Sequence, residues 1–175
     1  MEFSASCVAR RQFMIMKILA FDQATKTTGF AIIVDGTLKD HGVIKANASL
    51  DIISRMYEIA DMAGEMIDCE RPDVVMFEGV EGVKNERTMI CLANLQGMCL
   101  MSARHNGCTA DTIDVATWRH TLGFEMGRGI KREDLKAQAI AYVAKEYGVD
   151  CGDDEAEAIC IASAVWKKNL DSKEI

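Results

Sequence analysis

The sequence is poor in the residues that mark linkers and disordered tracts. It contains a single proline, Pro72, among 175 residues, and no segment is rich in Gly, Ser or Pro. This excludes a low-complexity tract and favours one folded domain. No apolar run approaches the roughly 20 residues of a membrane-spanning helix. We therefore expect a soluble protein of the cytoplasm with no membrane partner.

The seven cysteines lack the spacing of metal ligands or of a disulfide framework. Their number is odd, and no two of them form a C-x-x-C pair. Structural zinc sites usually draw ligands from such pairs, so the spacing disfavours zinc. We expect reduced thiols, most of them buried, as in a cytosolic protein.

The chain also lacks an excess of positive charge, because its formal net charge is −7. A protein that binds nucleic acid by charge alone is normally basic. A nuclease is still compatible, since its carboxylates hold cations and its DNA-facing charge can be local. The phosphate-binding loop G-x-x-x-x-G-K-[ST] is absent, and the chain is too short for a two-domain actin-like or sugar-kinase-like ATPase, which also begins with a strand, an Asp and a Thr-rich turn.

Hydrophobic patterning predicts strands and helices after an N-terminal extension. We expect residues 1–15 to be a disordered extension to a domain at 16–175. Strands are predicted at 17–22, 30–34, 38–45, 73–78 and 111–115, and helices at 49–69, 86–105, 135–147 and 155–168. Ser49 or Asp51 could cap the first helix. Short turns make the first three strands antiparallel, whereas helical crossovers make the later ones parallel. This order predicts an α/β fold with a mixed five-stranded sheet flanked by helices.

Acidic residues end two of the predicted strands and open the last helix. Asp22 ends the first strand, Glu78 ends the fourth, and Asp154 and Glu157 are three apart at the start of the last helix, so they share one face. The two strand ends should meet at one edge of the sheet, where ligands bind in such folds. Clustered carboxylates repel one another unless a cation offsets them, and oxygen ligands suit Mg²⁺.

Each acid alone has a simpler interpretation. A carboxylate at a strand end is often only a turn residue, and an acidic helix start usually compensates the helix dipole. The joint pattern favours a metal site, at which two Mg²⁺ ions can clamp a phosphate between the attacking water and the leaving oxygen. Mn²⁺ is a possible substitute. Asp153 is an alternative ligand to its neighbours.

Three segments around these acids resemble the motifs of RuvC-type crossover junction endonucleases, in particular divergent phage-like members. The segments are Phe-Asp-Gln-Ala-Thr-Lys-Thr-Thr-Gly-Phe-Ala at 21–31, Val-Met-Phe-Glu at 75–78 and Asp-Glu-Ala-Glu-Ala-Ile-Cys-Ile-Ala at 154–162. The resemblance implies an RNase H-like fold, a Mg²⁺-dependent homodimer and paired nicks across a four-way (Holliday) DNA junction. It also implies that Asp22, Glu78, Asp154 and Glu157 are the metal ligands and catalytic acids.

Two departures from the family pattern bear on these expectations. Glu157 stands where the family usually has Asp, so the metal geometry there could differ by one methylene. The turn after Asp22 lacks the Pro-Gly-Ser of the bacterial housekeeping enzymes, which bears on sequence preference more than on chemistry.

Several basic residues are candidates for DNA contact, and the resemblance places Lys131 near the scissile phosphate as a catalytic residue. Solvated surface positions explain them about equally well, and Glu133 and Asp134 dilute their charge. Trp118 is predicted to be a core residue rather than a platform for base stacking. The DNA-contact candidates are Lys84, Arg87, Arg119, Arg128, Lys131, Arg132 and Lys136.

Alternatives remain open on the sequence alone. The helix at 86–105 is apolar on more than one face, which fits either a second subunit or dense packing within a monomer. An RNase H-like nuclease could act on other branched DNA or on RNA–DNA hybrids. A non-catalytic, structure-specific DNA-binding protein could keep the fold, although acids without metal would repel phosphate.

Overall fold

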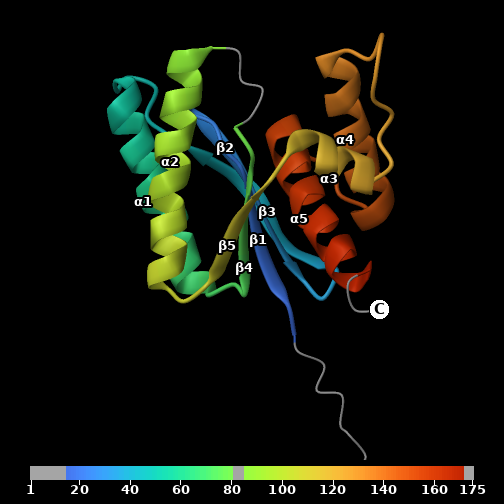
Figure 1. Ribbon diagram of the computed structural model, residues 1–175, viewed down its shortest axis with the longest axis horizontal. Helices are drawn as coiled ribbons and strands as arrows, with labels where there is room; N and C mark the ends of the chain where they lie inside the picture. Colours follow the sequence, from blue (N-terminus) through green and yellow to red (C-terminus); the bar gives the residue numbers. More distant parts are fainter. Residues whose placement is uncertain (1–14, 81–84, 172–175) are drawn as a thin grey trace, which may run out of the picture.

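A computed structural model describes residues 15–80 and 85–171 as a central sheet between two layers of helices (Figure 1). The elements follow one another as β1 (Lys17–Asp22), β2 (Thr27–Val34), β3 (Thr37–Lys45), α1 (Ile52–Glu70), β4 (Val74–Glu78), α2 (Glu86–His105), β5 (Thr109–Ile113), α3 (Val115–Thr121), α4 (Arg132–Tyr147) and α5 (Asp153–Asp171). The predicted extension at 1–15 lies outside the described residues except for Ile15, so it stays a prediction.

The sheet confirms the predicted mixed topology. Its strand order is β3-β2-β1-β4-β5. β2 pairs antiparallel with both β1 and β3, whereas β4 pairs parallel with β1 and β5. The short turns can join only antiparallel neighbours, and α1 and α2 supply the crossovers that parallel strands require. β1 is therefore the central strand, and both of its neighbours are hydrogen-bonded to it.

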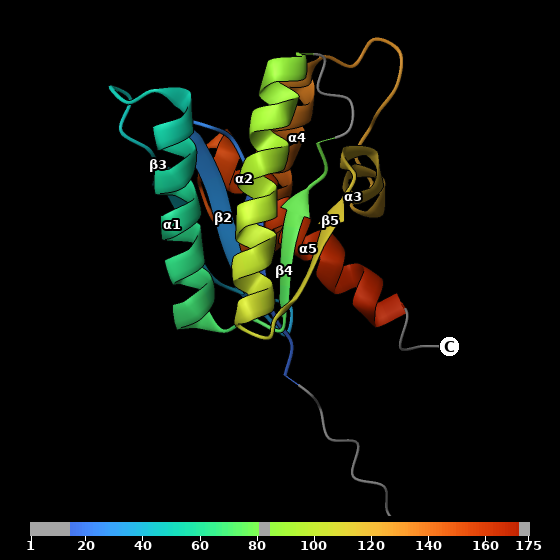
Figure 2. The same cartoon turned by 60° about the vertical axis from the view of Figure 1, so that its left-hand side comes forward.

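Each face of the sheet packs against its own helices. α1 and α2 cover one face, and α3, α4 and α5 lie over the other (Figures 1 and 2). Alternate residues of β1 point to opposite faces. Ile18 and Ala20 belong to the core beneath α5, whereas Leu19 and Phe21 belong to the core beneath α1 and α2. Because β1 is covered on both sides, its sequence is almost continuously apolar.

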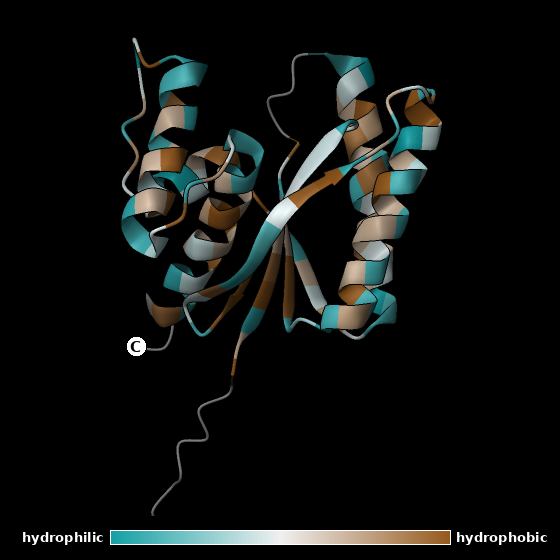
Figure 3. Cartoon of the chain, turned by 180° about the vertical axis from the view of Figure 1, so that it is seen from behind, coloured by the Kyte–Doolittle hydropathy of each residue, from teal (hydrophilic) through white to brown (hydrophobic). Residues whose placement is uncertain are grey.

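The outer strand β3 is polar where it faces solvent. Figure 3 shows this strand from outside, with hydrophilic residues along its first half. Lys39 and Asp40 are exposed there. Charged side chains on an edge strand oppose pairing with a second sheet.

The predicted boundaries differ from the structure mainly around β5. The strand ends at Ile113, not residue 115, and the unpredicted helix α3 begins at Val115. The cause is Asp114, whose carboxylate accepts hydrogen bonds from the backbone of Ala116 and Thr117 and so caps a helix. Val115 is apolar and follows the strand closely, so its side chain resembles a continuation of the strand. It is instead the first residue of α3.

Smaller differences concern the other ends of the elements. β2 begins at Thr27 rather than residue 30, α4 begins at Arg132 rather than residue 135, and α5 begins at Asp153 rather than residue 155. The N-cap of α1 is Asp51 rather than Ser49, because its carboxylate accepts from Ile53 and Ser54. The nine predicted elements otherwise occur in the predicted order.

The six described cysteines are free thiols, as predicted. Cys91, Cys99 and Cys160 are buried, Cys69 is exposed, and the other two are half-buried, so burial is less general than expected. Cys7 lies outside the described residues. Among the described helices, none has the length and apolarity to cross a bilayer.

Gly29 allows α5 to approach the sheet closely. It lies on β2 directly opposite Asp22 of β1. A Cβ at this position would lie 2.0 Å from the backbone oxygen of Asp154 and 3.3 Å from the Cβ of Ala158. A backbone atom cannot turn aside as a flexible side chain can, so a larger residue would displace the start of α5.

We predict that Gly29→Ala destabilises the protein by about 1–3 kcal/mol, the usual cost of overpacking. Urea unfolding measures the change. Gly97→Ala is the matched control, because a Cβ at Gly97 meets nothing within 4 Å and alanine favours the helix. Equal stability of Gly29→Ala and wild type would contradict the close approach of α5.

Candidate active site

The two strand-end acids lie at one edge of the sheet, where α5 also begins. β1 and β4 are parallel neighbours that end on Asp22 and Glu78. The close contact of Gly29 with Asp154 places the first turn of α5 beside Asp22. This edge is the upper end of the molecule in Figure 1. Three elements far apart in the sequence thus bring the predicted acids together.

The charges of these acids act on Asp22. Burial raises the pKa of Asp22 well above its usual range, and the negative charges of Glu78, Glu157 and Asp154 raise it further. The positive charge of Lys136 opposes the rise. A carboxylate surrounded by three others is unfavourable without a compensating cation. The structure therefore brings the four predicted acids close enough for the charges of the other three to act on Asp22.

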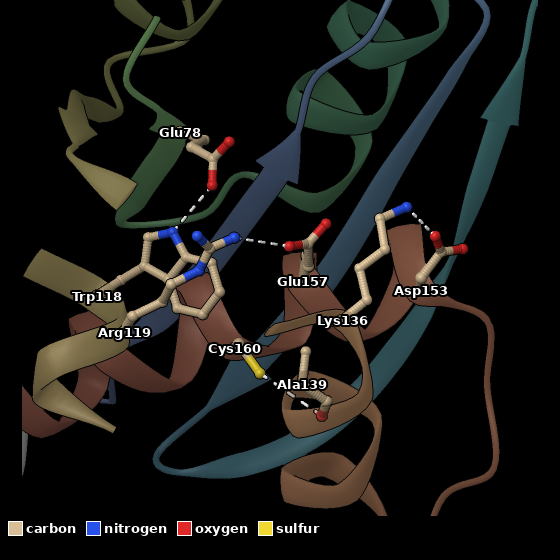
Figure 4. Close-up of polar contacts among 8 residues, drawn as sticks. All are labelled: Glu78, Trp118, Arg119, Lys136, Ala139, Asp153, Glu157 and Cys160. Carbon is tan, nitrogen blue, oxygen red and sulfur yellow. Dashed lines mark hydrogen bonds and ion pairs between the residues drawn. The ribbon is translucent and has the colours of Figure 1, made fainter. Parts of the chain in front are cut away.

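Two neighbouring residues of α3 hold two of the acids. The indole Nε1 of Trp118 donates a hydrogen bond to Glu78 Oε1 at 2.9 Å, and Arg119 Nη2 donates to Glu157 Oε1 at 3.0 Å (Figure 4). Burial raises the pKa of Glu78, whereas the hydrogen bond from Trp118 lowers it. Glu157 is only 8% exposed, so its pairing with Arg119 offsets the cost of burying its charge.

The main chain of Glu78 is held as well. The side-chain amides of Gln23 and Gln96 both donate to its carbonyl oxygen, the latter at 3.0 Å. Both glutamines are buried. Buried amide N–H groups need acceptors, and both side chains find one at the end of β4, whereas the amide oxygen of Gln23 is buried without a partner among the described residues. Neither glutamine was predicted as part of the site, because the sequence does not show that their side chains reach the main chain of Glu78.

Asp153 is held apart from this arrangement by a lysine of α4. Its carboxylate accepts a hydrogen bond from Lys136 Nζ (Figure 4), and that contact lowers the pKa of Asp153. In contrast, burial and the charge of Asp153 raise the pKa of Asp154. The pairing with Lys136 favours Asp154 over Asp153 as the ligand from this turn.

The predicted basic residues take different places. Lys136 pairs with Asp153, and its charge lowers the pKa of Asp22. The charges of Arg119 and Arg132 lower the pKa of Glu78. Lys131 is exposed and caps α4, where its backbone N–H donates to Asp134 at 2.8 Å. Arg87 and Arg128 are exposed. Lys84 lies outside the described residues.

The starts of α2 and α4 lie at the same end of the molecule as the acids (Figures 1 and 2). Arg87 and Arg132 open these two helices. Two exposed arginines thus lie at the acidic end of the molecule, although acidic residues share the first turns of both helices. Arg119 differs from the surface residues, because its side chain is only 15% exposed and is paired with Glu157.

The donor set fits a hard divalent cation. All four acids supply oxygen, which Mg²⁺ and similar ions prefer. Among the described residues, no three His, Cys, Asp or Glu side chains are already arranged as ligands of one ion. One oxygen of Glu78 accepts from Trp118 and one oxygen of Glu157 accepts from Arg119, which leaves the second oxygen of each carboxylate for a cation. A bound cation would also offset the burial and the negative charges that raise the pKa of Asp22.

A mixed sheet of this strand order, with the last helix packed against β1 and β2, has the RNase H-like fold. Solved structures support this fold. RuvC of T. thermophilus bound to a Holliday junction substrate matches with a TM-score of 0.71 and 15% identity, over 89% of this chain and 96% of that one. The yeast mitochondrial Holliday junction resolvase Ydc2 matches with a TM-score of 0.58 and 14% identity, over 90% of this chain and 82% of that one.

Sequence comparison is more specific. The family model described as crossover junction endodeoxyribonuclease RuvC matches residues 18–118. A RuvC of Dictyoglomus turgidum is 24% identical over 158 residues, which span 87% of this chain and 98% of the relative. One from Syntrophomonas wolfei is 28% identical over 152 residues, or 84% and 86% of the two chains. The chain belongs to the RuvC family and is an endodeoxyribonuclease of the divalent-metal-dependent kind.

We predict that Asp22→Asn stabilises the metal-free protein at neutral pH by roughly 0.5–2 kcal/mol, as is common when a functional site is neutralised. The raised pKa means that protonated Asp22 stabilises the fold at acidic pH, and this contribution is lost as the pH rises through the folded-state pKa. The advantage of the variant should therefore shrink toward pH 4. Urea unfolding in EDTA across this range measures it.

Asp150→Asn is the matched control for this experiment. Asp150 is an exposed acid just before α5, so its substitution removes the same charge outside the cluster. If both variants change stability alike at every pH, the effect is one of net charge, and the electrostatic strain at Asp22 is refuted.

Proposed function

We propose that the protein resolves four-way DNA junctions by paired phosphodiester hydrolysis. The observation that carries this function is the meeting of Asp22, Glu78, Asp154 and Glu157 at one sheet edge in a RuvC-family chain. The family match ends at Trp118, so the assignment of Asp154 and Glu157 depends on the placement of α5. A position in the cytoplasm, where DNA is accessible, is part of this proposal.

The same four acids would hold two Mg²⁺ ions, for which Mn²⁺ could substitute. When bound, such ions lower the pKa of a water molecule and offset the charge that develops on the leaving oxygen. Asp22 would contribute a ligand from the end of β1, the central strand of the sheet. Trp118 and Arg119 keep two of the carboxylates in place.

Basic residues around the cluster would bind the DNA backbone. Arg87, Arg128 and Arg132 are exposed and free to contact phosphates, which position a protein on DNA without reading its sequence. Lys131 precedes Arg132 at the start of α4 and is proposed to approach the scissile phosphate. Lys136 already lies at the acids, so it is a second lysine suited to this position. Lys84 remains a predicted DNA contact.

Paired nicking requires two sites, so we propose that the protein acts as a homodimer. α1 and α2 form a groove on the outer face of their layer, lined by Ile53, Met56, Tyr57, Met98 and Met101. Ile53, Tyr57 and Met101 are each at least 45% exposed, and Ile90 of α2 is half exposed. Apolar side chains gathered on one exposed face favour association with a second copy. The apolar second face of α2 expected from the sequence is therefore present.

We predict that Asp22→Asn abolishes junction cleavage but leaves junction binding within about threefold of wild type. Removing one carboxylate charge weakens metal capture, whereas the basic residues that contact phosphate are unchanged. Cleavage of a synthetic four-way junction with and without Mg²⁺, together with a gel-shift assay in Ca²⁺ or EDTA, measures the two effects. Asp150→Asn is the control of equal charge change and should cleave normally.

The substrate proposal is tested in the same assay by matched substrates. Symmetric nicks in the junction and little cleavage of a duplex, a flap or an RNA–DNA hybrid support it. Preferential cleavage of the hybrid or the flap assigns the protein to another RNase H-like activity. Absence of Mg²⁺-stimulated cleavage of any of these substrates favours a non-catalytic DNA-binding protein.

We predict that Met101→Glu raises the dimer dissociation constant at least tenfold, because a charge buried at an apolar contact is costly. Sedimentation velocity over a range of concentrations measures it. Met126→Glu is the matched control, since Met126 is a methionine of similar exposure outside α1 and α2. A wild-type protein that stays monomeric at all concentrations would refute the dimer, as would an unchanged constant for Met101→Glu.

A further inference from the structure

We propose that Trp118 is a positioning residue, whose indole N–H fixes the carboxylate of Glu78 in the orientation that metal binding needs. This inference rests on the proposed function and assigns a role that sequence reasoning did not give to Trp118. The residue was expected in the core, and it is indeed fully buried. Its polar end, however, lies at the active site (Figure 4).

The position of the indole is itself well determined. Phe124 packs against its ring edge-on, with 5.5 Å between ring centroids, and the Arg119 guanidinium lies 4.8 Å above the ring. The helix that carries it is capped by Asp114. A buried indole N–H needs an acceptor, and Glu78 Oε1 is the acceptor at 2.9 Å. The donor therefore has little freedom to move with the carboxylate.

The main chain of Glu78 is held independently of the indole. Gln23 and Gln96 donate to its carbonyl oxygen, and the N–H of Gly79 donates to the carbonyl of Ile113 at 2.8 Å. What remains free is the rotation of the Glu78 side chain. The hydrogen bond from Trp118 restricts that rotation, and it occupies only part of one oxygen's accepting capacity, so the second oxygen stays available.

A neutral donor differs from a cation in this position. Arg119, the next residue along α3, holds Glu157 with a positive charge, which competes with a metal ion for the same carboxylate. The indole orients Glu78 without opposing a cation. Partners that orient metal ligands in this way typically contribute 10–100-fold in metal affinity. Trp118 should contribute in this range.

The test measures metal binding without DNA and without turnover. Mn²⁺ titrations of wild type, Trp118→Phe and Trp166→Phe, followed by the electron paramagnetic resonance of free Mn²⁺, give dissociation constants. Trp118→Phe keeps an aromatic ring but loses the donor, and we expect a constant 10–100-fold higher than wild type. Trp166→Phe removes the only other tryptophan, whose indole lies beside Gly36 in the β2–β3 turn, and should match wild type.

A second readout does not require Trp118→Phe, so it stands even if that variant fails to fold. Two indole N–H resonances are expected in a ¹⁵N-correlated NMR spectrum, and Trp166→Phe identifies one of them. Mg²⁺ should shift the Trp118 resonance and leave that of Trp166 in place, because only Trp118 is bonded to a ligand of the metal. The shift should be absent in Asp22→Asn at the same Mg²⁺ concentration.

The outcomes separate this inference from the proposed function. If wild type binds Mn²⁺ and cleaves junctions but a folded Trp118→Phe binds Mn²⁺ as tightly as Trp166→Phe, the positioning role is wrong and the nuclease stands. A Trp118 resonance unmoved by saturating Mg²⁺ has the same meaning. If wild type binds no divalent ion, both the metal site and the role of Trp118 are refuted.

Discussion

The burial of Asp22 beside three other carboxylates is the constraint on which the rest of this structure depends. Asp22 lies at the end of the central strand, and the charges of Glu78, Glu157 and Asp154 all act on it. Such a cluster is costly in a metal-free protein, and a protein pays for it only where function needs it. Two features that are far apart along the chain help to hold these acids together. They are the close packing of α5 on the sheet and the hydrogen-bond partners supplied by α3 and α4.

Close approach of α5 to the sheet is the first of these features. Gly29 has no side chain, and so the first turn of α5 can lie against β2 opposite Asp22. Residues 156–165 of α5 are all buried, and their packing anchors the first turn, which carries Asp154 and Glu157. The apolar packing of one helix thus opposes the repulsion at its own N-terminus.

The second feature is the distribution of partners around the cluster. α3 supplies a neutral donor to Glu78 and a cation to Glu157, and α4 supplies Lys136 to Asp153. Exposed arginines at the starts of α2 and α4 surround the same edge. A net charge of −7 is therefore compatible with DNA binding. Exposed arginines can contact DNA locally, and bound metal ions would neutralise part of the negative charge.

The sequence by itself determined the order of the five strands and of four of the five helices, together with the mixed sheet, and it singled out four acids as candidate ligands. Those features depend on local periodicity and on chain connectivity, because short turns and helical crossovers allow few topologies. The membership of Asp22 and Glu78 in one site followed from the same rule, since parallel neighbours end at the same edge.

Only the tertiary structure decided which neighbours the acids have. The start of α3 at Val115 depended on the side chain of Asp114, and the ring of Trp118 then reached Glu78 across 40 residues of sequence. Gln23 and Gln96 reach the same strand end from opposite directions along the chain. The preference for Asp154 over Asp153 as the proposed metal ligand depends on Lys136 of α4, which pairs with Asp153. Hydrogen bonds between distant residues leave no periodic trace in the sequence, because they depend on where packed elements place single atoms.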